Sequence, residues 1–357
     1  MPDRKIKVLI VDDSALMRQL LTQILASDPE LEVVGTAVDP LYAMEKIPVL
    51  RPDVLTLDVE MPRMDGLTFL KQLMEKDPLP VVMVSTLTVE GGEVTLRALE
   101  LGAVDFFPKP TLRVLAQRGN ELHQIIEKVK TAARARLQPR IRSAATPPVV
   151  ALRPGVPVAE HSTRIIAIGA STGGTEAIRH VLTALPEDTP GIVIVQHMPP
   201  GFTASFARRL DGLCAINVRE AQNGDRVMPG TALIAPGDFQ MQLVRSRGEY
   251  SVHVFAGEPV NRHRPSVDVL FHSVAEQAGP NAVAALLTGM GADGARGMRR
   301  MRDAGAYTIA QDEATCVVFG MPREAIALGG ACSVLPLDRI GPELYRVATG
   351  GQEARAA

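Results

Sequence analysis

The sequence predicts two α/β domains, each built on a mostly parallel sheet, joined by a proline-rich linker. Short apolar runs alternate with amphipathic helical patterns through residues 1–130, and again through residues 164–350. Between them, residues 131–163 carry five prolines and several arginines without a sustained periodicity. The length of 357 residues also suits a two-domain chain.

The composition is that of an ordinary globular protein, with 46% hydrophobic and 22% charged residues. A net charge of −2 and the absence of Trp argue against a nucleic-acid binder. No apolar run reaches the ~20 residues of a membrane span, and the N-terminus does not resemble a signal peptide. The cysteines lack metal-ligand spacing and fit a reducing compartment. We therefore expect a cytoplasmic protein without membrane insertion.

The first domain opens with an apolar run that is typical of a buried strand, and helical patterns separate the runs that follow. Ser14 is a suitable N-cap for the first helix, whose leucines fall on one face. Five strand–helix units imply a parallel sheet with helices on both faces. The expected strands are residues 6–11, 33–37, 54–57, 81–84 and 103–106.

Polar residues occupy the ends of these strands. Asp12 and Asp13 follow the first strand, Asp58 ends the third, Ser85 ends the fourth and Lys109 follows the fifth. Because the carboxyl ends of parallel strands share one edge, these side chains converge there. Three carboxylates repel one another, and a hard cation such as Mg²⁺ relieves that repulsion. The pattern predicts a nucleophilic Asp58 that accepts a phosphoryl group, with Ser85 and Lys109 holding its oxygens.

Three segments of this domain resemble the response-regulator receiver family: Val-Asp-Asp-Ser at 11–14, Leu-Asp-Val-Glu-Met-Pro-Arg-Met-Asp-Gly at 57–66, and Pro-Lys-Pro at 108–110. The resemblance covers about residues 4–128 and implies a flavodoxin-like sheet. It also implies phosphorylation of Asp58 by a histidine kinase.

The receiver resemblance further assigns the metal ligands and the switch residues. Mg²⁺ would be held by Asp12, Asp13 and Asp58, and the switch pair would be Ser85 and Phe106. Many family members have Tyr at the second switch position, and Phe106 lacks its hydroxyl.

The linker contains a basic stretch at residues 134–142. We interpret it as a solvated, semi-rigid spacer, with contact to an acidic surface or nucleic acid as the alternative.

The second domain resumes the alternation and includes a hairpin over residues 239–244 and 250–255, turned at Arg247 and Gly248. Helices are expected at residues 175–185 and 266–277. The expected parallel strands are residues 165–168, 192–195, 232–235, 283–287 and 308–310.

Gly-Ala-Ser-Thr-Gly-Gly at 169–174 joins a strand to a helix and fits G-x-S-x-G, which projects a nucleophilic serine. The alternative is a phosphate-binding or capping turn. If Ser171 is the nucleophile, it needs a base, and His197 is the histidine that follows the neighbouring strand. Asp293, in a glycine-rich turn after a later strand, is the expected orienting carboxylate. The order Ser–His–Asp differs from that of α/β-hydrolases, so we expect a convergent site on another fold.

Gly289, Gly291 and Gly294 also satisfy G-x-G-x-x-G, and Asp312 follows at a distance that suits a dinucleotide-binding fingerprint. That fingerprint normally opens the first βαβ unit, whereas this turn comes late in the domain. A dehydrogenase would also leave Ser171 and His197 unexplained.

The segments 168–174, 196–203 and 287–294 resemble the CheB family of chemotaxis protein-glutamate methylesterases. Together with the receiver and the linker, the resemblance spans nearly the whole chain. It implies a doubly wound sheet and a Ser171–His197–Asp293 triad, with the oxyanion met by the backbone of Met290; Thr172 is a second expected donor. It implies methylated glutamates of chemoreceptors as substrate, and deamidation of receptor glutamines. No metal is needed for the ester reaction.

Two other function classes remain open at this level. A DNA-binding regulator is disfavoured because the second domain is too large for a helix-turn-helix module and is not strongly basic. An esterase for small metabolites is harder to separate, because a triad does not name its substrate.

Overall fold

The computed structural model describes residues 4–86, 89–112, 119–136 and 164–350. It divides into two compact units, Met1–Leu137 and Gln138–Ala357. Most of the predicted linker, and its basic stretch beyond residue 136, lie outside the described residues.

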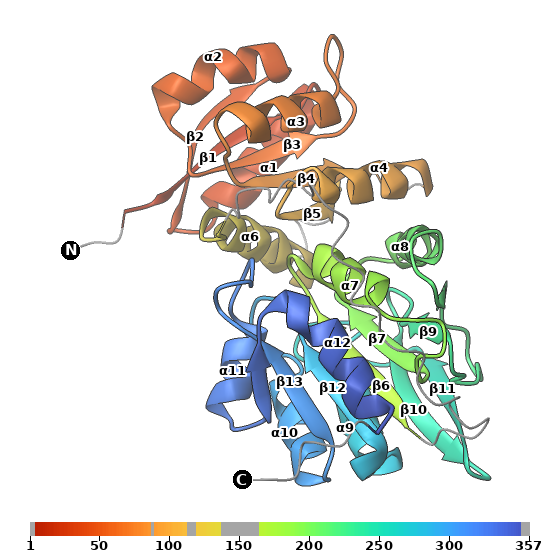
Figure 1. The fold of residues 1–357 in the computed structure, drawn as a ribbon. Coiled ribbons are helices and arrows are strands. Elements are labelled where there is room, and N and C mark those ends of the chain that lie inside the picture. Colours follow the sequence, from red (N-terminus) through yellow and green to blue (C-terminus); the bar gives the residue numbers. More distant parts are fainter. Residues whose placement is uncertain (1–3, 87–88, 113–118, 137–163, 351–357) are drawn as a thin grey trace. The chain divides into compact units, whose positions relative to one another are not determined.

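The first unit contains a five-stranded parallel sheet in the order β2-β1-β3-β4-β5, which confirms the flavodoxin-like prediction (Figure 1). The order reverses between β1 and β3, so the ends of these two strands flank the point where such sheets bind ligands. The strands are β1 (Ile6–Val11), β2 (Leu31–Ala37), β3 (Val54–Asp58), β4 (Val81–Ser85) and β5 (Asp105–Pro108).

Three helices of this unit begin at side chains that satisfy their free N–H groups. Ser14 caps the first helix as expected, and Asp39 and Asp65 cap the next two. The first and last helices of the unit pack against each other, as do the third and fourth. The helices are α1 (Ala15–Ala26), α2 (Pro40–Leu50), α3 (Gly66–Lys76), α4 (Val89–Glu100) and α6 (Asn120–Ala133).

The second unit contains a seven-stranded sheet in the order β14-β13-β12-β6-β7-β9-β8, and every pairing in it is parallel. The doubly wound prediction is therefore confirmed, with the order reversing between β6 and β12. The strands are β6 (Ile165–Ala170), β7 (Ile192–Gln196), β8 (Asn217–Glu220), β9 (Thr231–Ile234), β12 (Ala282–Leu286), β13 (Tyr307–Gln311) and β14 (Ser333–Leu335).

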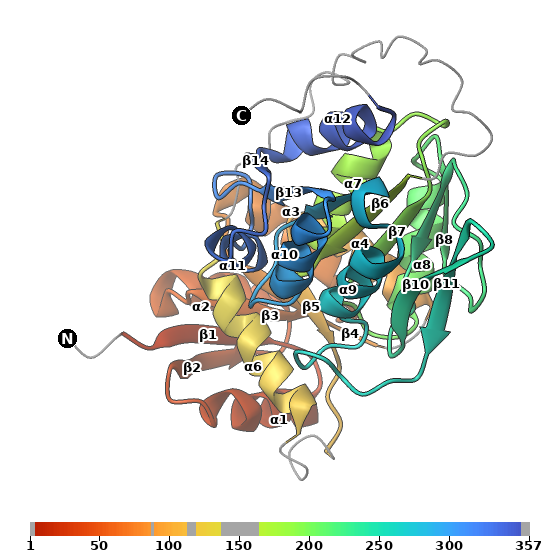
Figure 2. The same ribbon diagram turned by 90° about the horizontal axis from the view of Figure 1, so that it is seen from below.

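Helices cover both faces of this sheet, with α7 packed on α12 and α9 packed on α10 (Figure 2). The apolar core lies beneath them and is fully buried along β6, β7 and β12. The helices are α7 (Gly174–Thr183), α8 (Phe202–Asp211), α9 (Val267–Gln277), α10 (Ala295–Asp303), α11 (Met321–Ala327) and α12 (Leu337–Ala348).

The predicted hairpin is confirmed as β10 (Gln240–Ser246) and β11 (Glu249–Phe255), which pair antiparallel apart from the large sheet. Arg247 and Gly248 both have positive φ, as a two-residue hairpin turn of the primed type requires. The edge strands β8 and β14 were not predicted, because they are three or four residues long and only partly buried.

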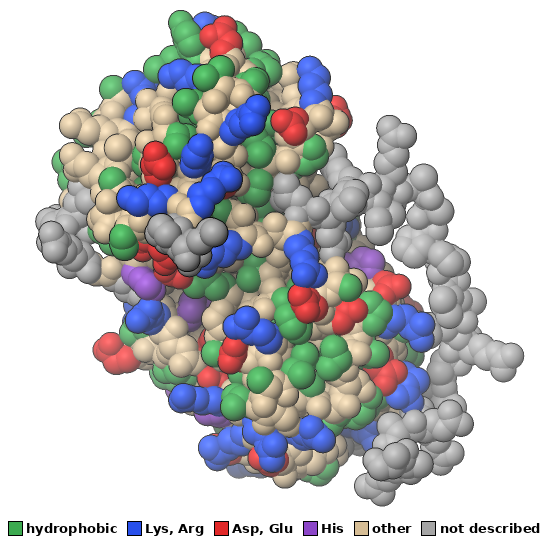
Figure 3. Space-filling view, turned by 90° about the vertical axis from the view of Figure 1, so that its left-hand side faces the viewer, with side chains coloured by type: hydrophobic (Ala, Val, Ile, Leu, Met, Phe, Trp, Pro, Cys, Tyr) green, Lys and Arg blue, Asp and Glu red, His purple; other side chains and the backbone are tan. Residues whose placement is uncertain are grey.

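Basic and acidic side chains are intermixed over the face of the molecule drawn in Figure 3, in keeping with the net charge of −2. Within the described residues, none of the helices combines the length and apolarity that crossing a bilayer requires.

Candidate functional site

Two neighbouring strand ends bring Ser171 and His197 side by side. Ala170 of β6 pairs with Gln196 of β7 in the parallel register, and Ser171 and His197 are the next residues along each strand. The backbone N–H of His197 donates to the carbonyl of Ala170 over 3.1 Å. This edge adjoins the point where the strand order reverses, which is where open α/β sheets place their active sites.

His197 and Asp293 form a buried pair. Nε2 of His197 lies 2.7 Å from Oδ2 of Asp293, and the two side chains are 7% and 1% exposed. The other ring nitrogen, Nδ1, is also buried and has no hydrogen-bond partner. Among the described residues no hydrogen bond joins the Ser171 hydroxyl to the His197 ring. The bond between His197 and Asp293 is therefore formed, whereas the bond between Ser171 and His197 is not.

The Asp293 carboxylate accepts more hydrogen bonds than a triad alone needs. Burial raises its pKa, but the hydrogen bond and charge of His197 and the hydrogen bonds from neighbouring side chains outweigh burial. The pKa of Asp293 therefore lies well below its ordinary value, and the group is ionised. Its donors are His197 Nε2, Asn261 Nδ2, Ser266 Oγ, and the backbone N–H groups of Val267 and Asp268.

The serine turn differs from the strained elbow of α/β-hydrolases. Ser171 is not among the described non-glycine residues with positive φ; the positive φ of +76° falls on Gly173 instead. The Ser171 carbonyl accepts from Gly174 N–H and from the Gln196 side chain, over 2.7 and 2.9 Å. A Cβ on Gly289 would lie 2.7 Å from Ser171 Cβ, so a glycine is needed where the two turns meet.

The expected oxyanion donors lie on two segments that are tied together. Ser171 N–H donates to the Thr288 carbonyl over 3.0 Å, and the Thr288 hydroxyl donates to the Thr172 carbonyl over 3.0 Å. These bonds hold the turn that carries Thr172 beside the turn that carries Met290.

The structure argues against the dinucleotide-binding alternative, because Asp312 is engaged within its own turn. The Asp312 carboxylate accepts from the backbone N–H and the hydroxyl of Thr315, over 2.9 and 2.6 Å, and so stabilises its own turn. The Gly289 N–H donates to the Val318 carbonyl. These groups are engaged in holding local structure rather than facing a ribose or a pyrophosphate.

Sequence reasoning missed three side chains of this site, Asn261, His263 and Ser266. Asn261 donates to Asp293, and the His263 ring stacks on His197 with centroids 3.7 Å apart. Asn261 and His263 lie in a connection without periodicity, where a polar Asn-Arg-His run was the available signal.

In the first unit the acidic residues converge as predicted. One carboxylate oxygen from each of Asp12, Asp13 and Asp58 lies within 4.8 Å of the others, with Asp12 and Asp58 buried and Asp13 exposed. Lys109 Nζ lies 2.8 Å from Asp58 Oδ2. Burial lowers the pKa of Lys109, but the hydrogen bond and charge of Asp58 outweigh it and raise the pKa overall.

The electrostatics of this cluster suit a divalent cation. Burial and the nearby charge of Asp58 raise the pKa of Asp12 to about 6, and burial raises the pKa of Asp58 although Lys109 bonds to it. Asp12 Oδ2 is buried without a partner. An oxygen cluster that keeps a net negative charge is the donor set that Mg²⁺ prefers, so the residues fit this ion.

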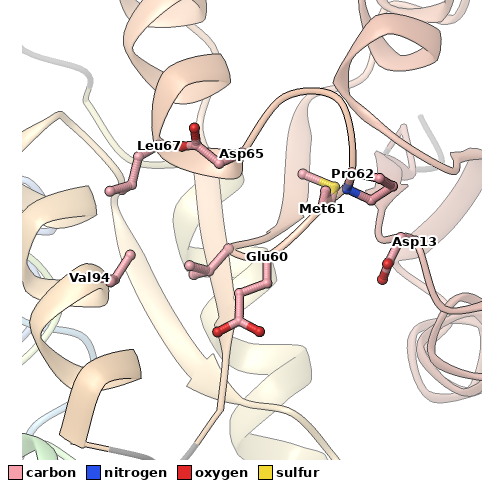
Figure 4. Close-up of a pocket in the computed structure, with 8 residues that line it drawn as sticks. Asp13, Glu60, Met61, Pro62, Asp65, Leu67 and Val94 are labelled. Atoms are coloured by element: carbon pink, nitrogen blue, oxygen red, sulfur yellow. The ribbon is translucent and has the colours of Figure 1, made fainter.

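The predicted switch residues lie on the strands beside the cluster. Ser85 is buried, and its hydroxyl donates to the Gly91 carbonyl over 3.2 Å rather than toward Asp58. Phe106 is buried, with Lys128 Nζ 5.4 Å from its ring centroid. A cavity of about 650 Å³ adjoins the cluster through Asp13 and has Glu60 in its wall (Figure 4).

Two family models match this chain. Residues 166–344 match the family described as CheB methylesterase, and residues 8–118 match the response regulator receiver domain. The catalytic domain of the Thermotoga maritima CheB methylesterase, a crystal structure, is 42% identical with a TM-score of 0.51, and the match covers 52% of this chain and 98% of that one.

Full-length relatives are similar over the whole chain. Proteins of Salmonella typhimurium and Escherichia coli O157:H7, both named protein-glutamate methylesterase/protein-glutamine glutaminase, are each 58% identical. Each alignment covers 98% of this chain and 99% of the relative. The chain therefore belongs to the CheB methylesterase family and carries a response regulator receiver domain ahead of its catalytic domain.

Proposed function

We propose that the protein hydrolyses methyl esters of glutamate side chains on chemoreceptors, and deamidates receptor glutamines, by acyl transfer through Ser171. The relatives named for these two reactions are similar over nearly the full chain. Ester and amide hydrolysis share one tetrahedral pathway, so a single site serves both.

The tautomer of His197 follows from the charge of Asp293. An ionised carboxylate only accepts hydrogen bonds, so Nε2 carries the proton that it shares with Asp293. In the neutral ring the lone pair then sits on Nδ1, which is buried and without a hydrogen-bond partner. Nδ1 is thus the nitrogen that takes the Ser171 proton as Oγ attacks the ester carbonyl. The serine bond forms with substrate present, as catalytic bonds in empty sites often do.

The remaining steps use the same groups. The backbone N–H groups of Met290 and Thr172 stabilise the oxyanion. The tetrahedral intermediate then collapses when Nδ1–H of His197 protonates the leaving methanol or ammonia. Water, deprotonated at Nδ1, then attacks the acyl-serine and releases glutamate and Ser171. Asp293 stabilises the imidazolium throughout.

The receiver controls this reaction in our proposal. A histidine kinase of the chemotaxis type donates a phosphoryl group to Asp58, with Mg²⁺ held by Asp12, Asp13 and Asp58 and the phosphoryl oxygens held by Ser85 and Lys109. Bound Mg²⁺ would neutralise the carboxylates against an anionic donor. Phosphorylation, passed on through Ser85 and Phe106, relieves a restraint on the esterase. The protein acts in the cytoplasm, where it meets neither nucleic acid nor membrane as a partner.

The observation that carries the proposal is the buried His197–Asp293 pair next to Ser171 at the sheet edge. Ser171→Ala and His197→Ala should each lower the rate of methanol release from methylated receptor by ~10⁴-fold or more, and Asp293→Ala by less. Near-full activity of His197→Ala would contradict the assignment of the base. A panel of soluble esters, run in parallel, tests the alternative of a metabolite esterase.

Phosphorylation is tested separately. Uptake of phosphoryl groups from a small-molecule donor should require both Asp58 and Mg²⁺. Labelling of Asp58→Asn at the wild-type rate, or of the wild type in excess chelator, would contradict this part of the proposal.

A further inference from the structure

A tight turn at residues 260–263 reaches into the catalytic centre. Val260 and His263 exchange two backbone hydrogen bonds, of 3.0 and 2.9 Å. Asn261 and Arg262 between them both have positive φ, 51° and 68°, the conformation of a primed two-residue turn. Asn tolerates this conformation better than most residues. The turn projects Asn261 and His263 toward the same pair of catalytic residues.

Asn261 links two buried carboxylates. Its Nδ2 donates to Asp293 Oδ1 over 2.7 Å and to Asp268 Oδ2 over 2.8 Å. Asp268 is 4% exposed, and its other oxygen accepts from the Gly297 N–H over 2.7 Å. Because the amide offers one hydrogen to each carboxylate, it screens their mutual repulsion and fixes the Asp293 carboxylate against rotation.

His263 restrains the catalytic ring in a second way. The rings of His263 and His197 are stacked with centroids 3.7 Å apart and planes 6° from parallel. The bond from Nε2 to Asp293 fixes one atom of His197 but leaves the ring able to rotate about that bond. A ring stacked on its face prevents this rotation, so the direction of Nδ1 becomes defined.

The turn itself is anchored from outside the site. The buried side chain of Gln240 donates from Nε2 to the carbonyls of Glu258 and His263, over 3.0 and 3.2 Å. Its Oε1 accepts from the Ser266 N–H over 2.9 Å. One amide therefore holds both ends of the connection that carries the turn.

We propose that the turn at 260–263 is a positioning element for the catalytic pair, in which Asn261 orients Asp293 and His263 sets the plane of His197. The inference rests on the proposed role of His197 as the base. It adds two positioning residues, which act through Asp293 and His197.

The test compares turn variants in the full-length protein with methylated receptor as substrate. Asn261→Ala removes a hydrogen bond to a charged group, and we expect kcat to fall about 10- to 100-fold with KM little changed. His263→Ala removes the stacked ring, and we expect kcat to fall about 3- to 10-fold. His263→Phe keeps a flat ring face and should restore most of that loss.

A spectroscopic readout separates positioning from general damage. The proton shared by His197 and Asp293 should give a low-field NMR resonance that broadens in Asn261→Ala and His263→Ala but persists in His263→Phe. His253→Phe is the matched control, because His253 also stacks on an aromatic ring, Phe255, in the same domain and bonds to Asn223 instead of the catalytic pair. It should behave as wild type in both measurements.

The outcomes distinguish this inference from the proposed function. If Ser171→Ala is inactive while Asn261→Ala and His263→Ala keep kcat within twofold of wild type, the positioning role is wrong and the triad stands. If His263→Phe is as impaired as His263→Ala, stacking is not the operative contact. Activity in Ser171→Ala would instead overturn the proposed function itself.

Discussion

The ammonium of Lys109 lies 2.8 Å from Oδ2 of Asp58, and this ion pair places a basic group on the residue expected to be phosphorylated. Asp58 is buried and would otherwise carry its charge with little compensation. The pair therefore serves two states: it stabilises the unmodified carboxylate, and it is in place to hold a phosphoryl oxygen.

Removing one partner of this pair should destabilise the receiver. We expect Lys109→Ala to lower the free energy of unfolding by about 2 kcal/mol without Mg²⁺, less than for a fully buried pair because Lys109 is partly exposed. The double variant Lys109→Ala with Asp58→Asn should recover most of that loss, because it leaves no unpaired charge. Hydrogen exchange of the β3 amides measures both, and additive effects in the cycle would contradict the coupling.

The raised pKa of Asp12 makes the receiver sensitive to pH. A carboxyl whose pKa is about 6 when folded and about 3.9 when unfolded binds protons more readily in the folded state, so its contribution to stability falls as pH rises from 4 to 6. Well above pH 6 without Mg²⁺, Asp12→Asn should be more stable than wild type by about 3 kcal/mol. Hydrogen exchange of the β1 amides should show about twice as large a difference in stability between the two proteins at pH 7.5 as at pH 5.

With Mg²⁺ bound, the wild type should instead be more stable than Asp12→Asn, because the ion binds the ionised carboxylate. We expect the Mg²⁺ affinity of the wild type to fall steeply once the pH drops below 6, as protons compete for Asp12. Calorimetric titration across pH 5–8 measures this. An affinity that is constant over the range would show that Asp12 is not a ligand.

Gly289 gives a steric test of the serine position. A Cβ there would lie 2.3 Å from Met321 Sδ and 2.7 Å from Ser171 Cβ, so both neighbours, or the glycine backbone itself, must move. We expect Gly289→Ala to lower kcat at least about 10-fold and to cost about 1–3 kcal/mol of stability. Gly212→Ala is the control, because its Cβ would meet ordinary contacts, the nearest at 3.7 Å. Equal activities in the two variants would mean that the serine turn can shift without lowering kcat.

The proposed restraint of the esterase by the receiver is tested by dividing the chain. Residues 150–357 should demethylate receptor faster than the unphosphorylated whole, and a phosphoryl donor should accelerate the whole but not the fragment. Relief of about 10- to 100-fold needs a free-energy difference of only about 1.4–2.7 kcal/mol between restrained and active forms. A fragment no faster than the whole, with no effect of the donor, would leave tethering as the role of the receiver.

The parts of the site that the sequence predicts are those that follow directly from strand ends. Ser171, His197 and Asp58 each lie at or just past the end of a buried apolar run. Such runs can be recognised in the sequence alone. The hairpin was predictable for a similar reason, since Arg247 and Gly248 separate two alternating segments.

Asn261 and His263 could not be placed in this way. Their roles depend on where a nonperiodic connection crosses the sheet edge, and that is set by distant contacts such as those of Gln240. Ser266 was expected to begin a helix, and it does, yet its hydroxyl donates to Asp293 over 2.7 Å instead of capping. A local signal can locate a residue correctly and still not reveal what it binds.

The hairpin has a rigid base and an unencumbered tip, and this difference makes it useful for protein engineering. Gln240, at the base of β10, is tied to the catalytic turn, so lengthening the strand there would shift the turn. At the tip, Arg247 and Gly248 are exposed, and a Cβ on Gly248 would meet nothing within 4 Å. An epitope or a fluorophore attachment peptide inserted between them would report on the catalytic domain while leaving its chemistry unaltered.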